Sequence, residues 1–342
     1  MAILSEILVN QERFTADVNK SQGIFLRQHI ISVYMKIMIT GGAGFVGSHL
    51  SEQLLKKNHE ITIITKKNTK NVENFKKELD ITKLDVTNFA KLEKTMIKKK
   101  PDVIIHLAGN TSHSKSFENP IKDLNSNTKS TLNLLQIIKQ SIPNCKFILG
   151  STFVVIGKPE KLPVDEQTKC NPTTIYGVNR LSSEHYTKIY NQVYGIDTNI
   201  FRITNSFGPR EQIIPNKNAI NYLIYKAFKN EDVTIYNKGK FFRDLIYISD
   251  VVNGIEKIVT KGKPGELYWI SSAKKTWFYQ LGNLLEKLTK TKTKYVNPPK
   301  YTKKVDVGNF VVNNKKLKAL GWKPKISLEE GIIRTLKYFE NV

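Results

Sequence analysis

The chain has 342 residues, of which 40% are apolar, so it can build a sizeable core in one large domain or two fused domains. Its formal net charge of +24 comes from scattered lysines without an arginine-rich stripe, so we expect phosphorylated substrates and no nucleic acid as partners. No apolar run approaches the ~20 residues of a membrane span, so we expect no membrane contact. The two cysteines have no metal or disulfide spacing, which indicates a reduced, cytoplasmic protein that binds no metal.

Residues 1–34 differ from the rest of the chain. They lack the charged start and cleavage site of a signal peptide, and Glu6, Glu12 and Asp17 argue against a transit peptide. We expect a loosely ordered N-terminal extension, or a translation start placed too early. Met35 looks like the natural start of the fold.

From Met35 onward, strands and helices alternate as in parallel α/β folds. The strands are predicted at 36–40, 60–64, 81–84, 103–107, 146–149 and 199–203, and the helices at 48–57, 90–99, 126–139 and 176–194. This order predicts an α/β fold with a Rossmann-like doubly wound parallel sheet over residues 35–205, to which part of 233–262 returns. After Gly208-Pro209 the alternation weakens, and residues 206–342 are predicted to form mainly a smaller, mixed α/β substrate-binding domain.

The first strand runs into a glycine-rich turn with G-x-x-G-x-x-G spacing. Gly41 permits the tight turn, Gly44 lets backbone N–H groups approach a pyrophosphate, and Gly47 lets the next helix pack close to the sheet. The N-terminus of that helix, at Phe45 and Val46, adds partial positive charge. Strand, turn and helix together predict a dinucleotide site.

The end of the second strand indicates which dinucleotide binds. An acidic residue there would accept hydrogen bonds from the ribose and repel a 2′-phosphate, but the chain has Thr65, Lys66 and Lys67. These side chains can bind a phosphate, so NADP is favoured over NAD, the alternative being ordinary solvated lysines. After the third strand, Asp85 and Val86 are expected at the adenine, the alternative for Asp85 being a loop cap.

Several short segments, taken in order, resemble one family. They are 40–47, 106–108, 151–152, Tyr176 with Arg180, 207–210, 243–244 and 320–324. From Met35 to about Phe339 the chain resembles an extended short-chain dehydrogenase/reductase of the nucleotide-sugar epimerase/dehydratase group. The resemblance implies a nicotinamide cofactor and a nucleotide-diphosphate sugar as substrate. It also implies a homodimer.

Tyr176, Arg180 and Thr152 are the predicted catalytic residues. Tyr176 and Arg180 are four residues apart at a helix start and share a face, so the cation is expected to lower the pKa of the phenol well below its free value of ~10. The resemblance makes Thr152 the partner of the reacting hydroxyl. The family normally has lysine at position 180, which also holds the nicotinamide ribose. Arg180 stays charged and can hydrogen-bond the ribose, although its longer, planar guanidinium does not reproduce lysine's geometry. Tyr176 and Arg180 are therefore also predicted cofactor contacts.

Three further positions resemble the family's cofactor contacts. Leu107 and Ala108 belong to the loop on the nicotinamide side, and Asn127 resembles an asparagine that helps to position the active site. Gly109 stands where alanine is commoner, and we expect the change to be tolerated. His106 is interpreted as a structural histidine at a strand end.

On the substrate side, Asn205, Arg243 and Lys303 resemble residues that contact the diphosphate and the sugar, together with Thr152. Such a ligand needs charge-assisted donors, and Arg243 is the firmest of these predictions. Lys303 supplies a point charge where the family commonly has arginine. A surface ion pair is the alternative for each of the charged residues.

Phe153 and Val154 follow Thr152, where sugar-nucleotide 4,6-dehydratases have an Asp-Glu pair. Without that acid/base pair, dehydration is not expected. The leading hypothesis is an NAD(P)-dependent nucleotide-sugar epimerase that works through a keto intermediate. The alternatives are an NADPH-dependent reductase of 4-keto sugar nucleotides and, from another class, a non-catalytic dinucleotide-binding module that docks on RNA or a protein.

Overall fold

The structure, a computed structural model, describes residues 34–66, 68–214, 219–299 and 305–341. The chain divides into two units, Met1–Tyr34 and Met35–Val342. Residues 1–33 lie outside the described residues, and with them nearly all of the predicted N-terminal extension. The features that follow belong to the second unit.

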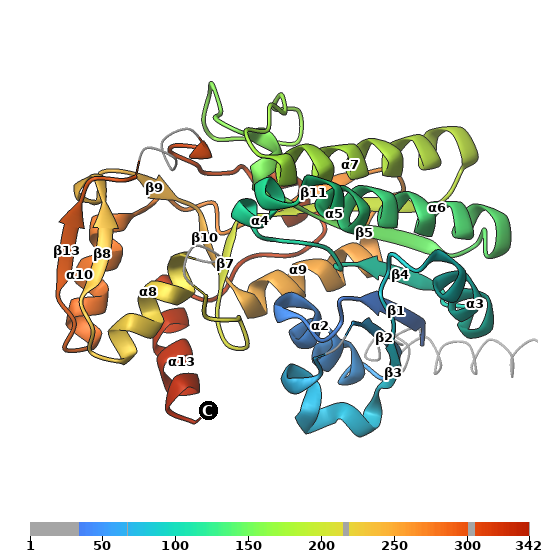
Figure 1. The fold of residues 1–342 in the computed structure, drawn as a ribbon, viewed down its shortest axis with the longest axis horizontal. Helices are drawn as coiled ribbons and strands as arrows, with labels where there is room; N and C mark the ends of the chain where they lie inside the picture. Colours follow the sequence, from blue (N-terminus) through green and yellow to red (C-terminus); the bar gives the residue numbers. More distant parts are fainter. Residues whose placement is uncertain (1–33, 67, 215–218, 300–304, 342) are drawn as a thin grey trace, which may run out of the picture. The chain divides into compact units, whose positions relative to one another are not determined.

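A seven-stranded sheet forms the centre of this unit, and all of its neighbouring strands are parallel (Figure 1). In the order β11-β6-β5-β4-β1-β2-β3, the strands are β11 (Leu267–Ile270), β6 (Thr198–Ile203), β5 (Lys146–Thr152), β4 (Val103–His106), β1 (Lys36–Thr40), β2 (Glu60–Thr65) and β3 (Asp80–Lys83). The chain order reverses between β1 and β4, and ligands of such sheets bind at the carboxyl ends of the strands at this point. The predicted fold class is confirmed.

Helices cover both faces of the sheet. One face carries α2 (Phe45–Leu55) and α9 (Ile248–Lys261), and the other carries α3 (Phe89–Lys99), α6 (Ser130–Ser141) and α7 (Ile175–Tyr194). Successive strand residues point to opposite faces, so Ile37 and Ile39 of β1 join the core under α2, whereas Met38 joins the core under α6. These near-continuous apolar strands suit a sheet that is buried on both faces.

Some element boundaries differ from the predicted ones. Helix α2 begins at Phe45, three residues before the predicted start at Ser48. The prediction missed this start because the N-cap residue, Gly44, has no side chain that could signal a cap. The helix predicted over 126–139 is divided into the π-helical turn η2 (Asn125–Lys129) and α6. Four short elements were not predicted: η1 (Lys70–Glu78), α4 (His113–Glu118), α5 (Pro120–Leu124) and η3 (Phe153–Ile156).

The second half of the chain contains three small sheets and several helices. The strand pairs are β7 (Asn205–Phe207) with β10 (Leu245–Tyr247), β9 (Phe242–Arg243) with β12 (Thr276–Trp277), and β8 (Val233–Tyr236) with β13 (Thr293–Val296). The helices are α8 (Ala219–Phe228), η4 (Asn237–Gly239), α10 (Phe278–Leu288), α12 (Lys315–Lys318) and α13 (Leu328–Glu340). None of the helices that the structure describes is long and apolar enough to cross a membrane.

The segment that returns to the main sheet comprises α9 and β11. Strand β11 pairs with β6 at the sheet edge, so the returning segment extends to Ile270, beyond the predicted range 233–262. Its four residues are fully buried, and their short apolar run has no period that distinguishes a strand from a helix. The division into a dinucleotide-binding part and a substrate-binding part stays a prediction.

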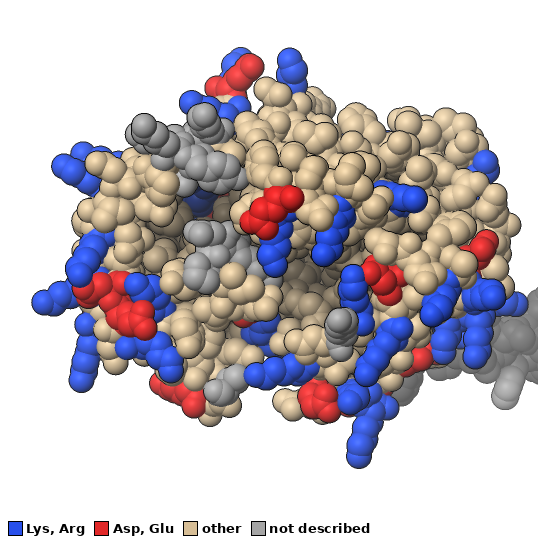
Figure 2. Space-filling model, in the orientation of Figure 1, with Lys and Arg blue, Asp and Glu red and all other residues tan. Residues whose placement is uncertain are grey.

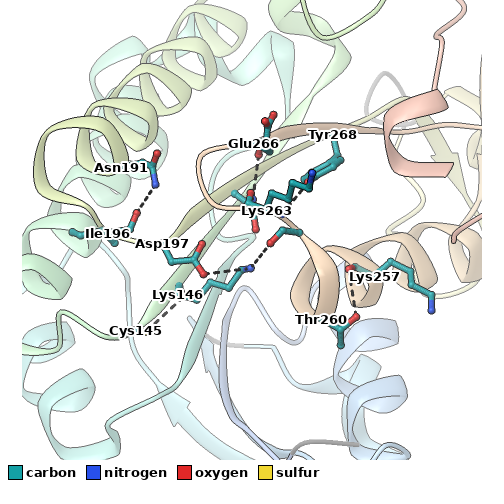
Figure 3. A network of polar contacts seen from close by, with 12 residues as sticks. Cys145, Lys146, Asn191, Ile196, Asp197, Lys257, Thr260, Lys263, Glu266 and Tyr268 are labelled. Atoms are coloured by element: carbon teal, nitrogen blue, oxygen red, sulfur yellow. Dashed lines mark hydrogen bonds and ion pairs between the residues drawn. The ribbon is translucent and has the colours of Figure 1, made fainter. Parts of the chain in front are cut away.

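A polar network fastens this returning segment to the amino-terminal edge of the sheet (Figure 3). Lys146, at the start of β5, donates to the carbonyl of Gly262 at 3.1 Å and lies 3.6 Å from Asp197. The backbone N–H of Lys263 donates to the hydroxyl of Tyr268 at 3.0 Å. These contacts lie at the opposite edge from the carboxyl ends of the strands, so we interpret the network as structural.

Candidate active site

A cleft of about 1800 Å³ lies at the carboxyl ends of the central strands, and its lining extends from Gly41 past Tyr176 to Arg243 and Phe278. A site for one small ligand usually measures roughly 300–1,000 Å³, so this cleft has room for two ligands. Figure 2 shows basic side chains around the hollow. The lining includes Lys66, Lys70, Lys122, Arg210 and Lys229. This excess of cations suits phosphorylated ligands.

The glycine turn forms one end of the cleft. Gly41 has a φ of 73°, and a Cβ there would lie 2.9 Å from a backbone nitrogen after β4. A Cβ on Gly47 would lie 2.3 Å from the carbonyl oxygen of Gly41, so both positions exclude a side chain. Because α2 starts after Gly44, the N–H groups of Phe45, Val46 and Gly47 have no partner inside the helix. Such a helix start suits a pyrophosphate.

The end of β2 lies beside this turn. The hydroxyl of Thr65 donates to the carbonyl of Asn68 at 3.3 Å, and Lys66 forms an ion pair with Asp85. The side chains of this pair are 63% and 32% exposed, and pairs of this kind are worth about 0–1 kcal/mol. A bound phosphate can therefore compete for Lys66. Lys67 lies outside the described residues.

Asp85 acts as a loop cap. It accepts hydrogen bonds from the backbone N–H and the hydroxyl of Thr87 at 3.0 and 2.9 Å. Burial raises the pKa of Asp85, but the hydrogen bonds from Lys66 and Thr87 outweigh it and bring the pKa below its ordinary value. Both Asp85 and Val86 line the cleft, and their contact with an adenine stays a prediction.

The loop after β4 and the turn η2 meet at Asn127. This side chain is fully buried, and neither its amide nitrogen nor its amide oxygen has a hydrogen-bond partner among the described residues. An unpaired buried polar group costs about 1–3 kcal/mol, so Asn127 points to a ligand in the cleft that it lines. Leu107 and Ala108 line the same part.

Gly109 is required here and not merely tolerated. Its φ is 153°, and a Cβ would lie 2.2 Å from the amide oxygen of Asn127. Arg180 supplies another buried atom without a partner among the described residues, its Nε. The glycine turn, Asn127 and Arg180 together fit a nicotinamide dinucleotide.

Tyr176 and Arg180 lie in the first turns of α7, which begins after Thr174. The hydroxyl of Thr174 accepts the N–H of Gly177 at 3.0 Å and caps the helix. Tyr176 is hydrogen-bonded to Thr152 at the end of β5. All three predicted catalytic residues line the cleft, so the structure brings them together.

The pKa of Tyr176 differs from the prediction. Burial raises it above its usual value, whereas the charge of Arg180 and the hydrogen bond with Thr152 lower it. The effect of burial outweighs the other two, so the pKa of Tyr176 is raised. The prediction that Arg180 lowers this pKa below its free value is wrong for the protein without a bound ligand. The phenol is 7% exposed, and removing water from a charged oxygen costs more here than one nearby cation returns.

A buried ion pair joins β6 to α7, and a hydrogen bond from Ser151 connects β5 to it. Arg202 donates two hydrogen bonds to Glu184, from Nε at 2.9 Å and from Nη2 at 2.6 Å. Ser151 donates to the same carboxylate at 2.5 Å. The two charged side chains are 2% and 1% exposed. Because Ser151 precedes Thr152, and Glu184 shares α7 with Tyr176, this pair helps to fix the distance between Thr152 and Tyr176.

The substrate-side predictions have different outcomes. Asn205 and Arg243 line the cleft, and the side-chain nitrogen of Asn205 is buried without a partner among the described residues. Arg243 is 8% exposed, forms an ion pair with Asp306 and lies over the ring of Phe241. Its guanidinium has five N–H donors. Asp306 and the carbonyls of Phe242 and Gly308 accept some of them. The remaining donors are available to a diphosphate. Lys303 lies outside the described residues.

The cleft wall beside Thr152 is apolar. Phe153 and Val154 both line the cleft, and Phe153 packs edge to face against Phe310 with ring centroids 5.2 Å apart. No carboxylate occupies these two positions. The acid/base pair that a dehydratase needs is therefore missing from this wall.

Among the cleft residues that the sequence analysis did not predict, one lies against Tyr176. His113, in the first turn of α4, lines the cleft, and its ring lies edge to face against Tyr176 with centroids 5.4 Å apart. A serine-rich loop gave no periodic signal for its position. The only sequence hint was its place seven residues after the strand end at His106.

Two other histidines stabilise the loops around the glycine turn. His106 is fully buried and hydrogen-bonded to the hydroxyl of Thr40 at 2.7 Å, which confirms its structural role. His49 of α2 is hydrogen-bonded to the carbonyl of Pro209 at 3.0 Å. Burial lowers the pKa of His106 to about 3 and that of His49 to about 4.

We expect acid to destabilise the protein between pH 7.5 and 5.5. Unfolded histidines bind a proton below pH ~6.5, whereas folded His49 and His106 do not until about pH 4 and 3, so each costs about 1.4 kcal/mol at pH 5.5. Asp244 opposes this change, because burial raises its pKa to about 6 and its protonation returns about 0.8 kcal/mol. Urea unfolding should show a net loss of about 2 kcal/mol.

The control for this prediction uses single substitutions. His106→Gln should remove about 1.4 kcal/mol, roughly two thirds of the net loss, whereas His185→Gln, at an exposed position of α7, should leave it unchanged. A stability that stays flat or rises from pH 7.5 to 5.5 would contradict the assigned burial of the two rings.

Among the residues that the structure describes, no group of three or more His, Cys, Asp or Glu is placed to hold a metal ion.

Known proteins are similar to this chain in sequence and in structure. A model of the GDP-mannose 4,6 dehydratase family matches residues 38–335. A putative UDP-glucose 4-epimerase from Methanocaldococcus jannaschii is 30% identical over 307 residues, covering 89% of this chain and 98% of the relative.

Two solved structures are similar over most of their length. UDP-glucose 4-epimerase from Thermotoga maritima, solved with UDP-glucose, has a TM-score of 0.83 and 28% identity, covering 89% of this chain and 98% of that one. UDP-glucuronic acid 4-epimerase from Bacillus cereus, solved with UDP-glucuronic acid and NAD, has a TM-score of 0.80 and 26% identity, covering 90% and 99%. The chain belongs to the NAD-dependent epimerase/dehydratase family of extended short-chain dehydrogenases/reductases.

Proposed function

We propose that this chain is a nucleotide-sugar epimerase that inverts a sugar carbon through a keto intermediate. The observation that carries the proposal is one continuous cleft that is lined by the glycine turn, by Thr152, Tyr176 and Arg180, and by Arg243. The similarity to UDP-sugar 4-epimerases supports the same reaction, and it makes UDP-sugars the first substrates to test.

The chain's own residues have distinct roles in this reaction. Tyr176 takes the proton of the sugar hydroxyl during oxidation and returns it during reduction, and Thr152 holds the reacting oxygen. Arg180 stabilises the phenolate. Asn205 and Arg243 hold the diphosphate by charge-assisted hydrogen bonds. A bound nicotinamide dinucleotide would accept a hydride from the sugar carbon and give it back to the other face.

A reductase of 4-keto sugar nucleotides is the second candidate, because Thr65 and Lys66 favour a phosphorylated dinucleotide. The two reactions differ in their use of cofactor. An epimerase interconverts two sugar nucleotides with a trace of dinucleotide and consumes none, whereas a reductase oxidises one reduced dinucleotide for each product. We therefore expect epimerisation of a UDP-sugar without a net change in nicotinamide absorbance. Oxidation of NADPH in the presence of a 4-keto sugar nucleotide, without epimerisation, would favour the reductase.

The non-catalytic module remains the rival from another class, and its motivation is Arg180 in place of lysine. The buried Nε of Arg180 has no partner among the described residues, which suits a ligand contact. A protein that binds a dinucleotide but neither binds nor converts any nucleotide sugar would support the module.

For the cofactor, NADP is favoured over NAD, although the Bacillus cereus relative was solved with NAD. We expect Thr65→Asp to reverse the preference, because a carboxylate there accepts ribose hydroxyls and repels a 2′-phosphate. Calorimetric dissociation constants for NAD and NADP test this. Thr69→Asp adds the same charge at a residue outside the cleft lining and should keep the wild-type preference. A wild-type protein that prefers NAD would contradict the assignment.

The partner proposed from the family resemblance is a second copy of the chain. Helix α7 exposes Val178, Ile189 and Val193 at 51%, 45% and 66%, and their spacing places them on one face. Figure 2 shows few charged side chains over this part of the surface. An apolar stripe of this kind suits an interface. Sedimentation should show a dimer that Val193→Lys dissociates.

A further inference from the structure

His113 contributes its ring to the cleft directly beside the catalytic phenol. The ring planes of His113 and Tyr176 make an angle of 70°, with their centroids 5.4 Å apart. The two rings come from different elements, α4 and α7, and both line the cleft. A molecule whose hydroxyl reaches Tyr176 therefore passes within reach of His113.

A buried polar network holds the backbone of His113 against α7. The side chain of Asn110 donates to the carbonyl of Ser112 at 3.2 Å and to Asp123 at 2.5 Å. Asn179, three residues after Tyr176 on α7, donates to the other oxygen of Asp123 at 2.7 Å. Asp123 is 1% exposed and Asn179 is 5% exposed. A buried network of this kind is rigid when its members are satisfied, so it fixes His113 relative to Tyr176.

The ring of His113 has hydrogen-bonding capacity to spare. Within the described ranges, no group is hydrogen-bonded to either ring nitrogen; Ser116 bonds only to the backbone carbonyl, at 2.7 Å. Burial lowers the pKa of His113, although Asp123 raises it. A neutral imidazole has one N–H donor and one acceptor nitrogen, which suits a sugar hydroxyl.

We propose that His113 is a substrate-contacting residue that hydrogen-bonds a sugar hydroxyl next to the one at Tyr176 and so selects which carbon reacts. Asp123 is its positioning residue, because it touches the His113 loop and α7 but does not line the cleft. The proposal rests on the proposed function, since it takes a sugar to be the group that enters between the two rings. It assigns sugar selection to a loop in which sequence patterns gave no signal.

The test measures affinity in the dinucleotide-loaded protein, in a Tyr176→Phe background that slows turnover. The probes are UDP-glucose, UDP-galactose and UDP-glucuronic acid, with UDP as the matched ligand that lacks the sugar. His113→Phe keeps an aromatic ring against residue 176 and removes both nitrogens. We expect it to weaken binding of at least one UDP-sugar about ten-fold and to change the affinities for UDP and for the dinucleotide less than about two-fold. His113→Gln, which retains a donor and an acceptor, should restore most of the loss.

Three results would overturn the proposal: unchanged affinity for every UDP-sugar, an equal loss for UDP and UDP-sugar, or a loss confined to the dinucleotide. A monodeoxy UDP-sugar gives a further check, because removal of the contacted hydroxyl should abolish the effect of His113→Phe. Failure of the proposed function is a separate result, since it would appear as wild-type protein that converts none of the UDP-sugars. In that case a His113 effect on UDP-sugar affinity would still identify a sugar contact.

Discussion

Replacement of Tyr176 by phenylalanine is expected to reduce kcat about 10²–10⁴-fold, because we propose that its hydroxyl moves the proton. The phenyl ring preserves the packing of a side chain that is 7% exposed. Affinity for the dinucleotide should change little, since Asn127 and the glycine turn remain. Initial rates of epimerisation, together with the dissociation constant of the cofactor, measure both effects.

The same helix supplies a matched control. Tyr190 is also 7% exposed, and its hydroxyl donates to Gln136 at 2.7 Å away from the cleft. Tyr190→Phe removes one hydroxyl from α7 and should keep kcat within about two-fold, at a stability cost of roughly 1 kcal/mol. Equal activities of the two variants would remove the catalytic role from Tyr176.

Glu184→Gln is expected to destabilise the fold by about 3–5 kcal/mol, because it leaves the charge of Arg202 buried and uncompensated. Two further contacts hold the guanidinium of Arg202 in its buried position. Its Nη2 donates to the sulfur of Cys170 at 3.1 Å, and the guanidinium lies 5.3 Å from the ring centroid of Trp269. Urea unfolding measures the loss as a lower midpoint. Because Glu184 also accepts from Ser151, activity should fall as well.

Two controls separate a buried charge from a generic loss of a glutamate. Glu330→Gln removes the partner of Arg334 in an exposed i, i+4 pair and should cost less than about 0.5 kcal/mol. The double variant Glu184→Leu with Arg202→Met removes both buried charges and should be more stable than Glu184→Gln alone. If the double variant is the less stable of the two, the assigned cost of the unpaired Arg202 is wrong.

Local patterns were enough to predict the part of the fold that carries the cofactor site. The strand before Gly41 and the helix after it form one contiguous segment, and the apolar runs of the central strands reflect burial on both faces. That the proposed catalytic residues share one cleft was predictable for a similar reason. Tyr176 and Arg180 lie four residues apart on one helix, and the family motifs add Thr152.

The features that were missed depend on contacts between distant segments. Strand β11 pairs with β6, more than sixty residues earlier in the chain, and its short apolar run does not specify that pairing. The pKa of Tyr176 depends on how deeply α7 is buried, which spacing does not show. His113 lies close to Tyr176 because α4 packs against α7, and the bonds of Asp123 to Asn110 and Asn179 connect these segments. The pair of Lys66 with Asp85 follows from the adjacency of β2 and β3.

We propose that this cleft inverts a sugar carbon by removing and returning its hydride while Tyr176 moves the proton. The most direct measurement follows UDP-sugars that carry deuterium at C4 through the reaction, with less dinucleotide than substrate. We expect an epimer that retains the deuterium at C4 and a dinucleotide that is not consumed. Replacement of the label by solvent hydrogen, or absence of any epimer while the dinucleotide is bound, would contradict it.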